Sequence, residues 1–142
     1  MKQTNINFSA EQTQMPQLDE VAVCGWLCKV AESHGFEVGR LGYVFCDDET
    51  ILRVNREFLG HDYYTDIITF DYTSGGVVSG DMYISLDTVA TNAELVGATF
   101  SRELHRVIVH GLLHLCGIDD KGPGEREIME ANENEALSIY DF

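Results

Sequence analysis

The fold and the chemistry of this chain both centre on one stretch, His110-Gly111-Leu112-Leu113-His114-Leu115-Cys116-Gly117-Ile118-Asp119-Asp120. Two histidines four residues apart lie one turn apart on the same helix face, where both can bind one metal ion. Gly117 suits the left-handed residue that ends a helix, so the chain can turn back and bring Asp119 or Asp120 toward the imidazoles. We therefore predict a metal site at a helix end, with His110, His114 and Asp120 as ligands and a fourth position open for water.

The helix that carries this site is expected to span residues 101–116, with Ser101 as its cap. Its apolar residues recur at helical spacing, which indicates a largely buried helix; they are Leu104, Val107, Ile108, Leu112, Leu113 and Leu115. Buried imidazoles need polar partners, which hydrogen bonds in the core or a metal ion can supply. Two histidines at this spacing, followed by glycine and two aspartates, favour the metal.

Further out along the chain, periodicity and turn residues predict four strands and four more helices. The strands fall at residues 5–10, 39–47, 65–72 and 80–85. The helices fall at residues 17–34, 48–58 with Asp48 as cap, 86–97 and 125–139. This order predicts an α+β fold in which a single domain, residues 1–142, packs about five helices on a mixed four-stranded sheet.

Composition indicates a globular protein, because 44% of the 142 residues are hydrophobic. No apolar run approaches the ~20 residues that span a bilayer, and the first residues lack the apolar core of a signal peptide. We therefore expect a cytoplasmic protein without a membrane association. Four scattered cysteines in such a chain are expected to be reduced thiols; they are Cys24, Cys28, Cys46 and Cys116.

The net charge of −15, from 24 acidic and 9 basic residues, argues against broad attraction to the phosphate backbone of nucleic acids. A nucleic-acid function would need a local basic patch or a bound cation. Arg53 and Arg56 share one expected helix, and Arg102 and Arg106 share another. Either pair offers such a patch, although pairing with the many carboxylates is the simpler expectation.

The ligand spacing His-x-x-x-His-x-x-Gly-x-x-Asp matches that of long zincin motifs, with aspartate in place of the third histidine. In zincins the general base follows the first histidine, but that position holds Gly111, which has no side chain. Peptide hydrolysis of the zincin type is therefore disfavoured. A metal-bound water can still be activated, because the cation lowers its pKa.

The central stretch resembles the signature of the YbeY family, His-Gly-x-Leu-His-Leu-x-Gly-aromatic-Asp-His. Three other segments resemble the family in the same order. Residues 55–70 match an Asn-containing helix end and the strand after it, with Asp62, Thr65, Asp66 and Phe70 in common. Residues 80–85 match a Gly-Asp-apolar strand, and residues 125–137 match a terminal helix rich in Glu and Met. The resemblance covers the chain from about Val44 onward.

The resemblance implies a metal-dependent endoribonuclease, specific for single strands, that acts in maturation of the small-subunit ribosomal RNA and in ribosome quality control. It implies one zinc ion per chain on His110, His114 and Asp120, with single-stranded ribosomal RNA and the small ribosomal subunit as partners. Two rivals remain open. One is a non-catalytic ribosome assembly factor with a structural metal, and the other is a metal hydrolase of another substrate, such as a peptide.

The sequence departs from the family pattern at three positions. Asp120 replaces the third histidine, Leu59 replaces an arginine and His61 replaces a lysine. We predict that Arg56, close to Leu59, contacts the substrate phosphate, and that His61 is a substrate contact or proton shuttle; a plain loop residue is the alternative for His61.

Several other residues have two interpretations at this stage. Asp81 could orient a ligand histidine, as carboxylates often do, or serve the turn after Gly80. Thr65 and Asp66 could cap a turn or line a cleft. Tyr63 and Tyr64 could stack on unpaired bases or pack against the protein. His105, off the face of His110, is expected to be structural.

Overall fold

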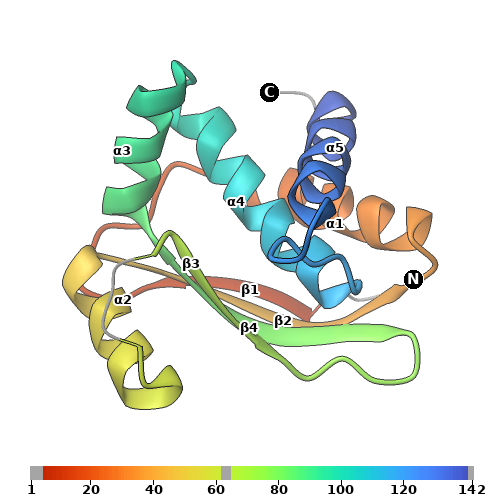
Figure 1. Cartoon of the computed structure of the whole chain (residues 1–142), viewed down its shortest axis with the longest axis horizontal. Coiled ribbons are helices and arrows are strands. Elements are labelled where there is room, and N and C mark those ends of the chain that lie inside the picture. The colour runs from red at the N-terminus through yellow and green to blue at the C-terminus, as the bar shows by residue number, and fades with distance from the viewer. Residues whose placement is uncertain (1–4, 62–64, 141–142) are drawn as a thin grey trace.

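Four strands form one mixed sheet in the order β1-β2-β4-β3 (Figure 1). The computed structural model describes residues 5–61 and 65–140. Strands β1 (Asn5–Ala10), β2 (Glu37–Cys46) and β4 (Val77–Ser85) run parallel to one another, and β3 (Ile67–Asp71) runs antiparallel to β4. With its helices the sheet makes a single α+β domain, as the sequence predicts. Both β2 and β4 begin a few residues earlier than expected.

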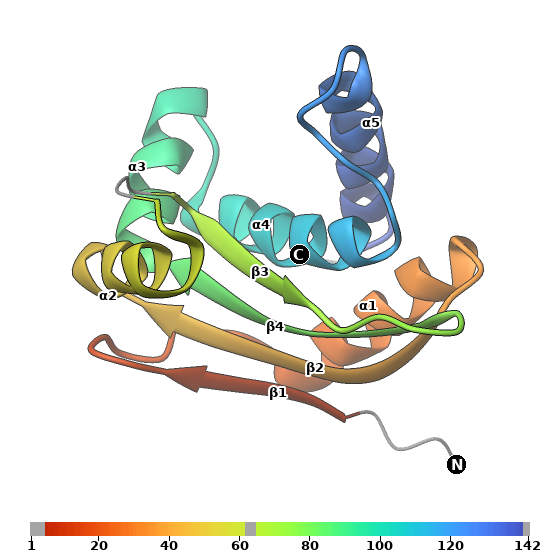
Figure 2. The same cartoon turned by 60° about the horizontal axis from the view of Figure 1, so that its bottom comes forward.

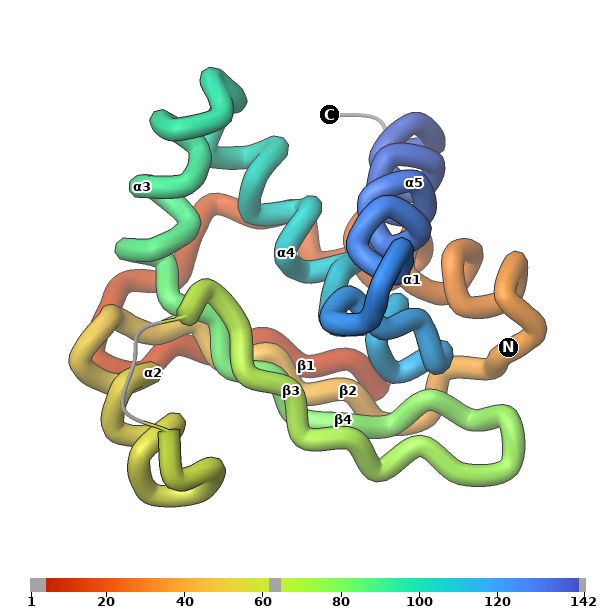
Figure 3. Tube along the Cα trace, in the orientation of Figure 1, coloured from red at the N-terminus to blue at the C-terminus, as the bar shows by residue number. Residues whose placement is uncertain are grey.

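The helices lie on both faces of this sheet. Helices α1 (Glu20–Ser33) and α4 (Phe100–Leu115) cover one face, and α2 (Asp48–Val54) packs on the other face at one end (Figures 1 and 3). Helices α3 (Leu86–Val96) and α5 (Glu125–Ser138) stand up on either side of α4 (Figure 2). Helices α3 and α5 therefore form two walls of a groove-like arrangement, and α4 forms the floor between them.

The larger core lies between the sheet and helices α1, α4 and α5. The alternating apolar residues of β2 point into it, and Leu41, Tyr43 and Phe45 are fully buried. Two buried hydrogen bonds tie the helices to it. The Tyr43 hydroxyl donates to the carbonyl of Ile108 at 2.9 Å, and the Trp26 indole donates to the carbonyl of Ala136 at 2.8 Å.

Helix α4 lies unusually close to the sheet at Gly111. A Cβ atom built there would lie 2.6 Å from Met82 Sδ and 2.9 Å from Ile67 Cδ1. The absence of a side chain at Gly111 therefore has a packing reason, since α4 can approach β3 and β4 only where one residue is small.

The cap of α4 is Thr99, whose hydroxyl accepts from the N–H of Arg102 at 3.1 Å. The expectation that Ser101 caps this helix is therefore wrong.

The helix expected at residues 48–58 is divided in two. Asp47 caps α2 by accepting from the N–H of Thr50 at 2.8 Å. Asp48, the predicted cap, instead accepts from the hydroxyls of Ser85 and Thr88, both at 2.6 Å. The helix then widens into a π-helical turn, η1 (Asn55–Leu59). This turn ends at Gly60, whose backbone is in the left-handed conformation.

A second, smaller core lies under α2 on the opposite face of the sheet and contains Cys46, Ile51, Val54 and Ile68. All four cysteines belong to the described residues, and each is free of disulfides, as expected. In the described part of the chain, no helix has the length and apolar character needed to cross a membrane.

Candidate functional site

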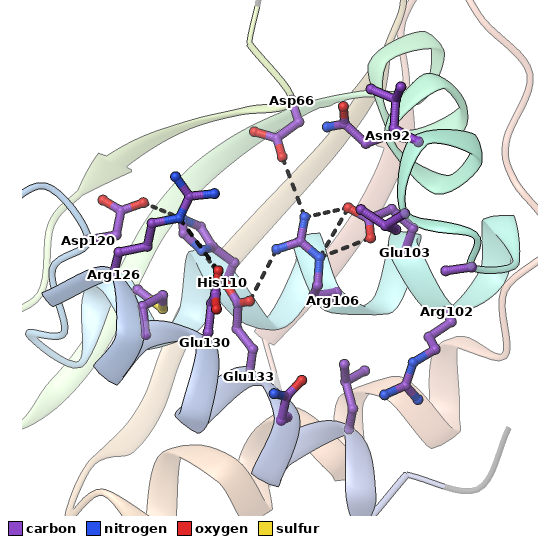
Figure 4. Close-up of a pocket in the computed structure, with 16 residues that line it drawn as sticks. Asp66, Asn92, Arg102, Glu103, Arg106, His110, Asp120, Arg126, Glu130 and Glu133 are labelled. Carbon is purple, nitrogen blue, oxygen red and sulfur yellow. Dashed lines mark hydrogen bonds and ion pairs between the residues drawn. The ribbon is translucent and has the colours of Figure 1, made fainter. Parts of the chain in front are cut away.

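A cleft of about 690 Å³ opens above the polar side of α4, between the walls made by α3 and α5 (Figure 4). Its floor comes from α4, and its lining includes Asp66, Asn92, Arg102, Arg106, His110 and Glu133. Asp66 enters from the start of β3, so of its two interpretations the structure supports the place in the cleft. Residues from three helices and from the segment just before β3 therefore meet here.

His110 lies at one end of the cleft between two carboxylates. Its Nδ1 is 2.7 Å from Glu133 Oε2, and its Nε2 is 3.6 Å from Asp120 Oδ2 (Figure 4). Its side chain is 19% exposed, while that of Glu133 is only 3% exposed. Glu133 therefore anchors the ring from inside the protein, and the Nε2 atom faces the open cleft.

The turn after α4 brings the two aspartates back to the helix, as predicted. Gly117 has a φ of 91°, in the left-handed region. The backbone N–H groups after the helix bond back to its last turn, so its end is closed. Asp120 then faces His110, while Asp119 Oδ1 lies 3.7 Å from Nδ1 of His114. Each histidine thus has an aspartate of its own.

The donor set suits a zinc ion, but the three predicted ligands are not gathered around one point. Imidazole and carboxylate are both zinc donors, and a carboxylate on the second ring nitrogen is the usual partner of a metal-binding histidine. Within residues 5–61 and 65–140, no three His, Cys, Asp or Glu side chains stand close enough to hold an ion as they are. His110 and Asp120 lie beside each other, with Nε2 and Oδ2 3.6 Å apart. The His114 side chain would have to move toward them to complete the site.

Arg106 connects the buried carboxylates of the cleft. Its Nε donates to Glu103 Oε1 at 2.9 Å and its Nη1 donates to Glu133 Oε1 at 3.1 Å, while Nη2 donates to Glu103 and lies 4.0 Å from Asp66. Glu103 and Glu133 are both almost fully buried. The hydrogen bonds from Arg106 to Glu103, above all, raise the pKa of Arg106, which keeps it a cation. This arginine is therefore paired, as the excess of carboxylates suggested.

The acidic surroundings favour positive charge at His110. Burial opposes protonation of its ring, but the hydrogen bond to Glu133 and the charge of Glu133 act the other way, with Asp120 and Asp66 adding to them. The pKa of His110 is consequently raised above its usual value of 6.5. Any cation at this end of the cleft would gain from the same field.

Arg56 and His61 are not brought together with the histidines. Arg56 belongs to η1, which continues α2 on the opposite face of the sheet, and His61 follows it. Neither is among the residues that line the cleft. Asp62, Tyr63 and Tyr64 lie outside the described residues.

Two further expectations have clear outcomes. Asp81 does not orient a ligand histidine, because its strand neighbours Gly80 and Met82 face α4 and it therefore points to the other face, beside Gly42. His105 is structural, as predicted: it is buried, its Nδ1 lies 2.6 Å from the carbonyl of Ser101, and burial lowers its pKa.

The sequence interpretation missed Glu103 and Glu133. A signal existed for Glu103, because Glu103, Arg106, His110 and His114 follow one another at spacings of three and four residues and so share one helix face. No such signal existed for Glu133. It reaches His110 from another helix, 23 residues further along the chain.

Comparison with known proteins agrees with this architecture. The family model described as "Endoribonuclease YbeY" matches residues 5–141. The chain belongs to the endoribonuclease YbeY family. A Parabacteroides distasonis protein named "Endoribonuclease YbeY" is 61% identical over 134 residues, which is 94% of each chain. A Phocaeicola vulgatus protein of the same name is 58% identical, covering 96% of this chain and 99% of its own.

The fold is also similar to that of a solved structure. The solution structure of a Thermotoga maritima protein superposes with a TM-score of 0.65 at 24% sequence identity, covering 94% of this chain and 87% of that one. At this identity the likeness concerns the fold. Its extent shows that the sheet and helices described above are a shared architecture.

Proposed function

We propose that this chain is a zinc-dependent endoribonuclease that cleaves single-stranded RNA in the cytoplasm, during maturation of the small-subunit ribosomal RNA and in ribosome quality control. That it is an enzyme acting on RNA follows from its membership of the endoribonuclease YbeY family. The observation that carries the metal dependence is His110, which Glu133 anchors through Nδ1 while Nε2 faces Asp120 across 3.6 Å.

In this proposal His110, His114 and Asp120 hold one zinc ion. When bound there, zinc would supply a water of lowered pKa and polarise a phosphoryl oxygen. The residues of the chain do the rest. Glu133 holds the ring of His110, and the walls of α3 and α5 confine the substrate between them.

The charges of the cleft support a cation as part of the enzyme. Five carboxylates line the cleft against three guanidinium groups. The carboxylates are those of Asp66, Glu103, Asp120, Glu130 and Glu133, and the guanidinium groups are those of Arg102, Arg106 and Arg126. An RNA phosphate would be repelled by this excess of negative charge. A divalent ion at the end of the cleft offsets that excess, because it supplies positive charge where the phosphodiester has to lie.

Substrate contacts outside the cleft remain part of the proposal. Arg56 would contact a phosphate, and His61 would contact RNA or relay a proton. Since neither lines the cleft, both would meet parts of an RNA chain that extends beyond it. The small ribosomal subunit would supply that RNA in its physiological context.

The proposal is tested by measuring cleavage of a single-stranded ribosomal RNA fragment by the zinc-loaded wild type and by the His114→Ala variant. We expect about one equivalent of zinc and RNA cleavage for the wild type, and loss of both in the variant. His34→Ala is the matched control, because His34 is the half-buried C-cap of α1 and is not among the residues that line the cleft. It should retain both.

Equal cleavage by the wild type and His114→Ala would rule out the zinc-dependent mechanism. Binding of zinc without any cleavage would favour the rival assembly factor with a structural metal. Preferential cleavage of a peptide panel would favour the other rival, and Gly111 in place of a general base argues against that result.

A further inference from the structure

The two carboxylate oxygens of Glu133 have different partners. Oε1 accepts from Arg106 Nη1 at 3.1 Å, and Oε2 lies 2.7 Å from Nδ1 of His110 (Figure 4). The side chain of Glu133 is 3% exposed. Because water hardly reaches it, the arginine and the histidine determine how this carboxylate lies.

The guanidinium of Arg106 and the carboxylate of Glu133 can each play only one hydrogen-bonding role. A guanidinium donates and never accepts, and a carboxylate accepts and never donates. The proton between Glu133 and a neutral His110 must therefore reside on Nδ1 of the imidazole. The other ring nitrogen, Nε2, then has no proton and carries a free lone pair. It is this atom that faces Asp120.

We infer that Glu133, which Arg106 holds in place, sets the tautomer of His110 and so keeps Nε2 free to bind a metal ion. Glu133 is a positioning residue in this inference, because it contacts Nδ1 and not Nε2, and Arg106 in turn positions Glu133. The inference rests on the proposed function in one respect, namely that Nε2 is the atom the metal uses. The position of the proton is a property of the chain itself.

Replacing Glu133 with glutamine turns this arrangement into a sharp test. The amide keeps the size of the side chain but has one accepting oxygen and one donating nitrogen. Arg106 can only donate, so it requires the amide oxygen. The amide NH₂ group then faces Nδ1 of His110, which must accept, and the ring proton moves to Nε2. The isosteric variant therefore blocks the atom that the metal needs.

Glu103 supplies the matched control. It is buried to the same degree, at 2% exposure, and it accepts hydrogen bonds from both Nε and Nη2 of Arg106. Its bonds in this network come from the guanidinium and leave the contact between Glu133 and His110 untouched. Glu103→Gln thus removes an equally buried negative charge that is paired with the same arginine. It should leave the proton of His110 on Nδ1.

The experiment is nitrogen NMR of the His110 imidazole in metal-free protein, at alkaline pH where the ring is neutral. We expect the proton on Nδ1 in the wild type and in Glu103→Gln, and on Nε2 in Glu133→Gln. Adding Arg106→Met to Glu133→Gln lets the amide turn its oxygen toward the ring, so the proton should return to Nδ1. A merely structural role of Arg106 does not produce this return.

Titration with Zn²⁺ gives the second readout. Glu133→Gln should bind about 10–100-fold more weakly than the wild type, the range found for partners of metal-bound histidines, whereas Glu103→Gln should stay within about threefold of the wild type. Comparable losses in both variants would overturn the inference, since they would reflect general damage to the network.

Three NMR results would also overturn it: a wild-type proton on Nε2, a Glu133→Gln proton that stays on Nδ1, or no return in the double variant. The wild-type spectrum alone is decisive if the variants do not fold. Because this readout needs neither metal nor RNA, it separates the two proposals. A wild type with the expected tautomer but no zinc binding would refute the zinc-dependent function and leave the control of the tautomer standing.

Discussion

Arg106 should be the most costly polar side chain of the cleft to remove. In Arg106→Met, Glu103 and Glu133 keep their burial, at 2% and 3% exposure, but lose their shared cation. Breaking a buried ion pair by deleting one partner costs about 3–5 kcal/mol, because the remaining charge is uncompensated. The Arg106 side chain is 31% exposed, so water can enter the gap. We therefore expect a loss of about 3 kcal/mol in the free energy of unfolding.

Urea denaturation at neutral pH measures this loss, and a decrease of roughly 6–12 °C in the melting temperature should accompany it. Arg126→Met is the control, because Arg126 and Glu130 form an ion pair at 3.5 Å whose side chains are 80% and 59% exposed. A solvated pair of this kind contributes little. Its removal should change the unfolding free energy by no more than about 0.5 kcal/mol.

The size of the loss tests the reasoning. A loss below about 1 kcal/mol would refute the idea that the two buried carboxylates are left uncompensated when Arg106 is removed.

Two further predictions concern packing and pH. Gly80→Ala places a methyl group 2.5 Å from the carbonyl oxygen of Phe70, a backbone atom that cannot move freely, and should destabilise the protein by about 1–3 kcal/mol in urea denaturation. In metal-free protein the raised pKa of His110 should stabilise the fold below about pH 6.5, and this stabilisation should be lost as the pH rises through the raised pKa; His110→Gln should lack that part of the pH dependence.

Each of these has its own control. Gly25→Ala lies on the exposed face of α1, where a new Cβ meets nothing within 4 Å, so it should stabilise the helix by about 1 kcal/mol. If both glycine variants changed stability in the same direction, close packing at Gly80 would not be the cause. Parallel pH profiles for the wild type and His110→Gln would contradict the assignment of the transition to His110.

Local patterns along the chain were sufficient for most of the fold. The alternation in β2 and the helical spacing of apolar residues in α4 identify both elements before any partner is known, because each pattern reflects one buried face. The mixed four-stranded sheet and the layer of helices follow from the order of such elements. Helix caps were less predictable. Asp47 and Asp48 are adjacent and chemically alike, and only contacts of Asp48 with Ser85 and Thr88 decide which of them is left to cap α2.

The site divides in the same way. The spacing of His110 and His114 and the glycine turn before Asp120 are features of a continuous stretch, so the sequence by itself determined that these side chains lie at the end of one helix. Only the tertiary structure decided which carboxylate holds His110. Glu133 comes from a helix whose position depends on the packing of the whole core, and no local periodicity encodes a contact between faces of two separate helices. The same long-range packing turned Asp81 away from the site and placed Arg106 among its carboxylates.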